Sequence, residues 1–448
     1  MFATRSLAQP GVILLDVGTH EVRALAAAFE GGRLQVRGAA MREFSAGRDG
    51  ILVDLEAARA GLGEVLDAAA RQSGLAIRRV VAGVGGTHVR CVRARGSLSL
   101  RIPVIVRESH LERILDAAAD IGLPRDHEVL HVLPTGYRVD GARTVRAPLG
   151  MRARRLAAET AVVIVSRLAL DNLERVLGEV GFELVDAAAE PLVAARAALT
   201  AEDRRCGAVL VDIGAENVGA AVYRDAVLQG LVCLGAGGAH VSRDLAYALR
   251  VDSVQAEALK RRLGVAQVAS ADRSRRVEVQ HAGRPAYVSQ TAVAHVIEPR
   301  MREILSLVRD ALHAQHALSP ADRVVLVGGG ARLQGVDELA ERVFGVPARV
   351  GEPVPQGDRG HAAPDRPSCA ALGLVAFASW SGLGARRRRA PSWSAAVERL
   401  RRVLGAGARA GPGAAAARSA RQLERSVHVT PRGGVDLEVR DVRVRTRV

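Results

Sequence analysis

Aromatic residues and paired cysteines are scarce in this chain of 448 residues. Phe, Trp and Tyr make up 3% of the sequence while apolar residues make up 48%, which predicts cores packed by small aliphatic side chains. The four cysteines, Cys91, Cys206, Cys233 and Cys369, have no paired spacing. This argues against a disulfide framework or a zinc site and indicates a reducing compartment.

Long apolar runs are also missing. The apolar run at 11–15 ends at Asp16, and no segment reaches the ~20 apolar residues that a membrane-spanning helix requires. We therefore expect neither a standard export signal nor a membrane span. The length exceeds what one hydrophobic core usually serves, so two or more packed units are expected.

Lysine is nearly absent, and positive charge is concentrated at the C-terminal end. The formal net charge is +15, and residues 385–448 alone contain 16 arginines against five acidic residues. The rest of the chain is therefore close to neutral. A basic tail is typical of proteins that bind an anionic surface or nucleic acid. Lys260 is the only lysine.

One sequence pattern occurs twice, 196 positions apart. A buried strand runs into Asp-x-Gly and a tight turn at Asp16 and Gly18, and again at Asp212 and Gly214, each followed by a returning strand. This predicts a duplicated α/β domain with a cleft between its halves. Helical periodicity is expected at 55–73, 107–121, 168–180, 191–199, 239–249, 253–263, 292–313 and 335–343. Further strands are expected at 80–84, 159–165 and 324–327.

The two turns favour phosphate binding. A glycine lets backbone N–H groups approach phosphate oxygens, and an aspartate can hold a hydrated divalent cation that bridges them. A third glycine element follows the buried strand at 324–327 and could pass close under a base or ribose. Its residues are Gly328, Gly329 and Gly330.

Together these elements resemble the actin-like ATPase superfamily, and further segments resemble one of its members, the FtsA family of bacterial cell-division proteins. The resemblance covers roughly residues 11–380. The segments that carry it are 50–56, 128–134, 137–141, 148–151, 190–192, 237–240, 297–300 and 327–350, in the family's order.

The resemblance implies an α/β, actin-like fold of two lobes, built from duplicated ribonuclease-H-like domains, with a small α/β subdomain inserted in the first lobe and a basic C-terminal tail. The expected first-lobe core is 1–86 and 161–198, with the inserted subdomain at 87–160. The second-lobe core is 199–235 and 296–380, with its own subdomain at 236–295. The expected tail consists of a basic linker (381–391), an amphipathic membrane-targeting helix (392–404) and a flexible segment (405–448).

The resemblance also implies an ATP site with Mg²⁺. Asp16, Gly18 and Thr19 would form the first phosphate turn, Asp212 and Gly214 the second, and both aspartates would hold the metal. Glu190 would orient the attacking water, with a helix-start carboxylate as the alternative reading. The other expected nucleotide contacts are Gly237, Gly238, Glu257, Lys260, Gly328, Gly329 and Gly330. A solvated ion pair is the alternative for Glu257 and Lys260.

The second turn departs from the family's usual Asp-x-Gly-Gly-Gly-Thr-Thr-Asp. Residues 212–219 read Asp-Ile-Gly-Ala-Glu-Asn-Val-Gly, which brings Glu216 toward the phosphates. At ~4 Å and an effective dielectric constant of ~20, each charge pair would repel by about 4 kcal/mol. In the first turn, Glu21 replaces a family lysine. We therefore expect weak ATP binding and at most a slow ATPase.

The segment at 392–404 has an apolar stripe flanked by arginines, and it follows four arginines at 386–389. This predicts reversible binding to anionic membrane. Packing back onto the protein and nucleic-acid binding are the alternatives, and we expect no nucleic-acid partner. The residues expected to contact the membrane are Trp393, Val397, Leu400, Arg401, Arg402 and Leu404.

A protein of this family would bind FtsZ through the second-lobe subdomain, associate with itself, and contact later division proteins through the first-lobe insert. It would act at the cytoplasmic face of the inner membrane at the division site. The alternatives are a PilM-like pilus-assembly scaffold and a sugar-kinase-type enzyme on the same fold. A kinase should keep an intact phosphate motif, and the PilM reading does not explain the segments 131–134 and 148–151.

Overall fold

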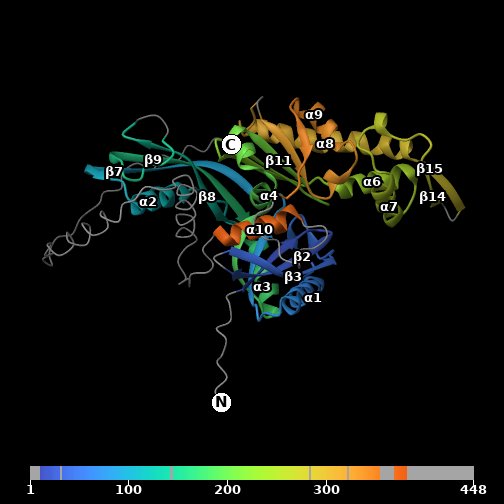
Figure 1. Cartoon of the computed structure of the whole chain (residues 1–448), viewed down its shortest axis with the longest axis horizontal. Helices are drawn as coiled ribbons and strands as arrows, with labels where there is room; N and C mark the ends of the chain where they lie inside the picture. The colour runs from blue at the N-terminus through green and yellow to red at the C-terminus, as the bar shows by residue number, and fades with distance from the viewer. Residues whose placement is uncertain are drawn as a thin grey trace, which may run out of the picture.

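The structure is a computed structural model that describes residues 11–30, 33–141, 145–281, 284–319, 322–353 and 368–380. The expected basic linker, amphipathic segment and tail at 381–448 lie outside the described residues. Figure 1 shows two lobes that each contain a central sheet. Within the described part of the chain, no helix is long and apolar enough to cross a membrane.

The first lobe is built on a five-stranded sheet of order β10-β6-β1-β2-β3. Strand β1 is antiparallel to β2 and parallel to β6, β2 is antiparallel to β3, and β10 is parallel to β6. The strands are β1 (Gly11–Val17), β2 (Glu21–Glu30), β3 (Arg33–Glu43), β6 (Arg79–Val84) and β10 (Glu183–Ala189). A two-stranded hairpin, β4 (Gly47–Arg48) and β5 (Ile51–Leu52), follows β3.

The second lobe repeats this sheet with the same order and strand directions, β13-β12-β11-β16-β17. Its strands are β11 (Ala208–Ile213), β12 (Val218–Arg224), β13 (Val227–Leu234), β16 (Arg323–Val327) and β17 (Ala348–Val350). The helices after the third, fourth and fifth strands correspond as well. They are α1 (Leu55–Ser73), α3 (Arg167–Glu179) and α4 (Glu190–Ala198) in the first repeat, and α8 (Gln290–Ala314), α9 (Val336–Phe344) and α10 (Cys369–Trp380) in the second. The duplication predicted from the two Asp-x-Gly turns is confirmed.

The eight helices predicted between residues 55 and 343 are present, and the described residues contain two more that were not predicted. Helix α1 has its predicted bounds because the Asp54 side chain caps its N-terminus, accepting from Ala57 N at 2.9 Å, and Gly74 ends it in a left-handed conformation. The unpredicted helices are α5 (Ala201–Cys206), which is short, and α10, which is apolar on all sides and so lacks an amphipathic period. Short 3₁₀ turns occur at η1 (Val268–Ser270) and η2 (Gly330–Arg332).

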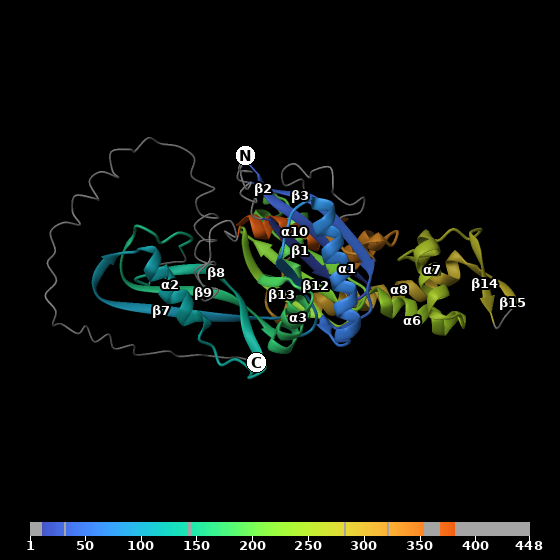
Figure 2. The same ribbon diagram turned by 90° about the horizontal axis from the view of Figure 1, so that it is seen from below.

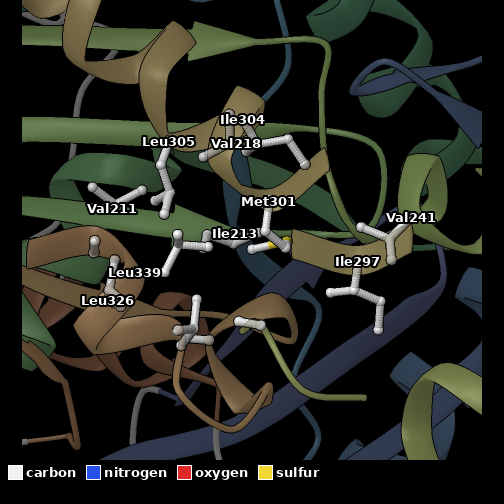
Figure 3. Packing of buried hydrophobic residues seen from close by; sticks show 14 of the residues in the cluster. Val211, Ile213, Val218, Val241, Ile297, Met301, Ile304, Leu305, Leu326 and Leu339 are labelled. Carbon is white, nitrogen blue, oxygen red and sulfur yellow. The ribbon is translucent and has the colours of Figure 1, made fainter. Parts of the chain in front are cut away.

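The last helix of each repeat packs on the sheet of the other lobe. Helix α10 covers Leu14 and Val81 of the first sheet, while α4 covers Leu210 and Val325 of the second. The outer face of the first sheet is covered by α1 and α3. On the outer face of the second sheet, Met301 and neighbouring α8 side chains pack with Ile213, Leu326 and Leu339, as Figure 3 shows. The exchange of α4 and α10 makes each lobe's core depend on the other repeat.

The crossing of α4 and α10 requires a glycine. A Cβ at Gly373 of α10 would overlap the carbonyl oxygen of Val193 in α4. We expect Gly373→Ala to lower the free energy of unfolding by about 1–3 kcal/mol, because the helices must separate to make room. Gly178→Ala in α3 is the matched control, since a Cβ there meets no atom within 4 Å and gains helix propensity. Thermal unfolding followed by circular dichroism compares the two, and equal midpoints would refute the close crossing.

A subdomain is inserted between β6 and α3. It contains a three-stranded sheet of order β7-β9-β8 with one helix on one face. Its elements are β7 (Arg90–Ile105), α2 (Glu108–Ala119), β8 (His127–Val139) and β9 (Arg152–Ser166). The C-terminal end of β9 lies between the lobes, because Val163 and Val165 pack with Val84 of the first lobe and Leu231 of the second.

A second subdomain lies between β13 and α8. Its elements are α6 (Gly238–Leu249), α7 (Ser253–Leu263), β14 (Arg276–His281) and β15 (Arg284–Ser289). Figures 1 and 2 agree that this subdomain and the first-lobe insert lie at opposite ends of the long axis of the molecule.

Candidate functional site

The two Asp-x-Gly turns have the same backbone shape. Gly18 N donates to Glu21 O at 3.0 Å, and Gly214 N donates to Asn217 O at 2.9 Å. Counted from the aspartate, each position of one turn therefore corresponds to one position of the other. Thr19 corresponds to Ala215 in this register.

Three carboxylates face one another where the lobes meet. Burial, together with the charge of Asp16, raises the pKa of Asp212 to about 7. Burial also raises the pKa of Glu190 well above its usual value, and the charges of Asp16 and Asp212 add to the shift. Burial raises the pKa of Asp16, with a smaller effect from Glu21 in the same direction. The predicted metal and catalytic residues are thus brought within electrostatic reach of one another.

Two side chains hold Asp16, one from the neighbouring strand and one from a distant part of the chain. Ser368 Oγ donates to Asp16 Oδ2 at 2.6 Å and also caps α10 by accepting from Ala371 N at 3.0 Å. Arg23 Nη1 lies 3.8 Å from the same carboxylate oxygen and also pairs with Glu21. Sequence reasoning missed both residues, although Arg23 is the register partner of Asp16 across the β1–β2 hairpin.

Glu190 begins α4 and lies against the backbone of the first lobe. A Cβ at Gly85 would overlap its carboxylate, and one at Gly83 would lie 3.2 Å from its Cγ. The N–H of the preceding residue, Ala189, donates to His131 Nε2 of the insert at 3.1 Å. His131 also makes an edge-to-face contact with Phe377 of α10, with ring centroids 5.9 Å apart. The insert therefore helps to position the start of α4, a role that the sequence did not reveal.

The donor set fits a hydrated divalent cation. Carboxylate oxygens are the ligands that Mg²⁺ prefers, and a cation would offset the burial and the mutual repulsion that raise the pKa values of Asp212 and Glu190. Among the described residues, no three His, Cys, Asp or Glu side chains are arranged to ligate one ion directly. The residues that would hold the cation are Asp16 and Asp212.

The predicted adenosine contacts lie beside the second turn. A Cβ at Gly237 would be 2.6 Å from Ala215 O, and the N–H groups of Gly238 and Ala239 donate to Gly214 O at 2.9 Å and Ala215 O at 2.7 Å. The start of α6 is thus bound to the turn through its amides. Those two N–H groups have their partners within the protein.

Lys260 has protein partners for its whole ammonium group. Its Nζ donates to Gly238 O at 2.9 Å, Ser242 Oγ at 2.8 Å and Glu257 Oε2 at 2.6 Å. An ammonium group has three N–H donors, so a nucleotide contact would replace one of these bonds. Burial acts to raise the pKa of Glu257, but the hydrogen bonds from Lys260, Ser242 and Arg261 lower it to about 2.

The third glycine element passes directly over the second turn. Gly328 has φ +87°, and a Cβ there would overlap Asp212 Oδ1. Gly330 packs on the Ile213 side chain, whereas a Cβ at Gly329 would meet no atom within 4 Å. The structure therefore packs the third glycine element onto the second turn, where Gly329 is the open position.

Glu216 makes a contact that the sequence did not reveal. Its Oε2 accepts a hydrogen bond from Asp49 N, across the cleft in the first lobe, at 3.5 Å. Beside the first turn, Gly18, Thr19, Gly50 and Gly85 line a cavity of only about 20 Å³, which is the size of one water molecule. The dipeptide Asp49-Gly50, a common hairpin turn, was the signal that could have identified this part of the site.

Comparison with known protein families gives two matches. The family described as "Cell division protein FtsA" matches residues 209–372, and the family described as "SHS2 domain inserted in FTSA" matches residues 86–164. The second match coincides with the subdomain between β6 and α3.

Curated relatives and solved structures agree with these matches. The chain is 32% identical to the cell division protein FtsA of Pseudomonas aeruginosa over 76% of this chain and 83% of that protein. It is 27% identical to the FtsA of Bacillus subtilis, over 82% and 83%. The PilM–PilN type IV pilus biogenesis complex is similar at a TM-score of 0.56 and 18% identity, over 82% of this chain and 98% of that chain. MreB5 of Spiroplasma citri bound to ADP is similar at 0.50 and 15%, over 82% and 95%. At these identities the two structures show the fold, which is actin-like.

Proposed function

Because the chain belongs to the FtsA family of cell division proteins, we propose that it is an actin-like adaptor that tethers FtsZ filaments to the cytoplasmic face of the inner membrane. The observation that carries the proposal is the 32% identity to a curated FtsA over 83% of that protein's length. The inserted subdomain and its separation from the second-lobe subdomain support an adaptor with two partner surfaces. The PilM-like alternative rests on likeness of fold at 18% identity.

FtsZ is proposed to dock on the second-lobe subdomain at 236–295. This segment has nine basic residues against five acidic ones, which suits an acidic peptide. Its helices and hairpin also present large side chains to solvent. Tyr247 is 89% exposed, Val254 77% and Tyr287 70%. Exposed aromatic side chains are frequent anchors at protein interfaces.

Replacing Tyr247 and Tyr287 by Ser should release FtsZ. Truncation of an interface aromatic typically costs about 2 kcal/mol or more, so we expect at least a ~30-fold loss of affinity. The assay is co-sedimentation of FtsZ with anionic liposomes, which should require this protein. Met41→Ser is the matched control, since Met41 is 59% exposed but lies on β3 of the first lobe. Full FtsZ recruitment by the double Tyr variant would place the docking site elsewhere.

Later division proteins are proposed to contact the first-lobe insert. Helix α2 covers one face of its sheet so closely that a Cβ at Gly96 would overlap Ile114 O. The other face carries the exposed side chains of Arg95, Arg138 and Arg155. No described element covers this face, and its arginines outnumber Glu159, which pairs with Arg138 at 3.0 Å; the surplus of positive charge supports a partner segment with negative charge.

The site residues are proposed to keep their family roles in weakened form. Asp16 and Asp212 would hold hydrated Mg²⁺, and Glu257, Lys260 and the glycines at 237–238 and 328–330 would surround the adenosine. Mg·ATP would supply the phosphoryl group, and Glu190 would orient the attacking water. Burial and the charges of Asp16 and Asp212 raise the pKa of Glu190, which disfavours the carboxylate that would orient the water, and we propose a slow ATPase at most.

We also propose that the protein associates with itself into an actin-like polymer or dimer. The domain boundaries expected from the sequence are proposed unchanged. The membrane anchor is proposed at 392–404. That segment lies outside the described residues, so the anchor rests on its sequence pattern and on the family. No nucleic-acid partner is proposed.

A further inference from the structure

The second residue after the glycine of each Asp-x-Gly turn contacts the other lobe. In the second lobe this residue is Glu216, whose Oε2 accepts from Asp49 N of the first lobe at 3.5 Å. In the first lobe it is His20, whose Nε2 accepts from Arg261 Nη2 of the second-lobe subdomain at 2.9 Å. The two contacts are therefore related by the duplication, and both join the lobes directly.

The hydrogen-bond donor in the first lobe, the Asp49 N–H, is held rigidly. Asp49 and Gly50 have φ +52° and +79° at the tip of the β4–β5 hairpin, as in a type I′ turn. The Asp49 carboxylate accepts from Thr87 N at 3.2 Å and also from Thr87 Oγ1. A Cβ at Gly86 would overlap Asp49 O, so the turn lies directly on that backbone. The Asp49 N–H is thus fixed in the direction of Glu216.

The hydrogen-bond donor in the second lobe, the Arg261 guanidinium, is also held in place. Arg261 Nε donates to Glu257 Oε1 at 2.8 Å, which fixes the guanidinium on α7. The other oxygen of Glu257 accepts from Ser242 Oγ at 2.6 Å and from Lys260. Arg261 therefore reaches His20 from a hydrogen-bonded network.

Groups that could bind a nucleotide already have protein partners at this junction. The amides of Gly238 and Ala239 bond the carbonyls of the second turn, and Lys260 uses its three donors. Glu216 meanwhile brings a fixed negative charge to the phosphate side of the cleft and satisfies a backbone N–H there. The Glu216 carboxylate thus places a negative charge of the protein itself in this part of the site.

We propose that Glu216 and His20 form a cross-lobe clasp that holds the two lobes closed without nucleotide, with the Glu216 carboxylate in the position of a phosphate group. Nucleotide then becomes dispensable for the closed state. A protein with this clasp would present its two partner surfaces in one fixed relation. The proposal concerns closure alone and stands whether or not FtsZ is the partner.

The test measures the distance between the lobes in the full chain. Spin labels are attached at Ala60→Cys on α1 and Ala248→Cys on α6, both exposed positions, with the exposed Cys206 replaced by Ser. Cys91 and Cys369 should react slowly, because burial raises the pKa of their thiols to about 11 and about 12. Without nucleotide we expect one narrow distance distribution that Mg·ATP does not change.

Two Glu216 variants, each combined with His20→Ala, separate the hydrogen bond from the charge. With Glu216→Ala, both clasp contacts are lost, and each lost contact should raise the open-to-closed ratio by about tenfold, seen as a longer distance component. Glu216→Gln keeps an acceptor and should remain mostly closed. Circular dichroism checks that all variants are folded.

Three outcomes would overturn the clasp. The first is a broad distribution in the parent protein that narrows only with Mg·ATP. The second is a Glu216→Ala variant with the parent's distribution. The third is opening of Glu216→Gln to the same extent as Glu216→Ala, because the acceptor would then not be what holds the lobes.

Discussion

Replacing Glu216 by Gln should tighten the binding of Mg·ATP by about ten- to a thousandfold. A carboxylate ~4 Å from a phosphate charge repels it by about 4 kcal/mol at an effective dielectric constant of ~20, which sets the upper limit. The lower limit applies because Glu216 is partly exposed and already accepts a hydrogen bond from Asp49 N. Isothermal titration calorimetry with Mg·ATP measures the change directly.

Glu202→Gln is the matched control for this prediction, since it removes one exposed carboxylate from α5 outside the turns. Its affinity for Mg·ATP should equal that of the parent. Submicromolar binding with steady turnover by the unchanged protein would contradict the prediction, as would an unchanged affinity in Glu216→Gln. Glu216→Gly should tighten binding as well, but it also removes the cross-lobe acceptor.

Leu400→Glu should abolish binding to anionic liposomes at any salt concentration. Leu400 lies in the middle of the apolar stripe of the proposed anchor, and each large apolar side chain inserted at the interface contributes about 1.5–3 kcal/mol. A charge there opposes insertion of the whole segment. Changing the four arginines at 386–389 to Gln should instead weaken binding mainly at low salt, because exposed charges are screened over ~8 Å at physiological ionic strength. Liposome flotation over a salt series distinguishes the two effects.

Ala395→Glu is the control for the anchor. At 100° per residue it lies on the opposite side of the proposed helix from Leu400, so the added charge should be tolerated. The anchor would lie in 405–448 if Leu400→Glu still bound liposomes while truncation after Leu404 did not.

Much of the fold could be predicted because its signals are local. The bounds of α1 and α7 follow from an aspartate cap at Asp54 or Asp252 and an apolar period. The paired Asp-x-Gly turns predicted the duplication, and the structure then showed the same strand order in both lobes. Helix α10 was missed because it is buried between the lobes and therefore has no polar face to mark its period.

Individual residues of the candidate site could be predicted from the sequence, but the contacts between distant residues could not. Asp16, Asp212 and Glu190 were expected together, and the structure places them together with raised pKa values. Ser368 was not expected, because it is 352 positions from the aspartate to which it donates. Nothing in a short sequence window indicates such a pairing.

The sequence by itself determined the two turns, their spacing and the charge that Glu216 brings to one of them, since backbone propensities and residue chemistry act over a few positions. Only the tertiary structure decided where that charge is directed. Glu216 meets a backbone N–H 167 positions away, and His20 meets a guanidinium 241 positions away. Both contacts exist because the exchanged helices α4 and α10 fix how the two lobes face each other, and that packing depends on the whole core.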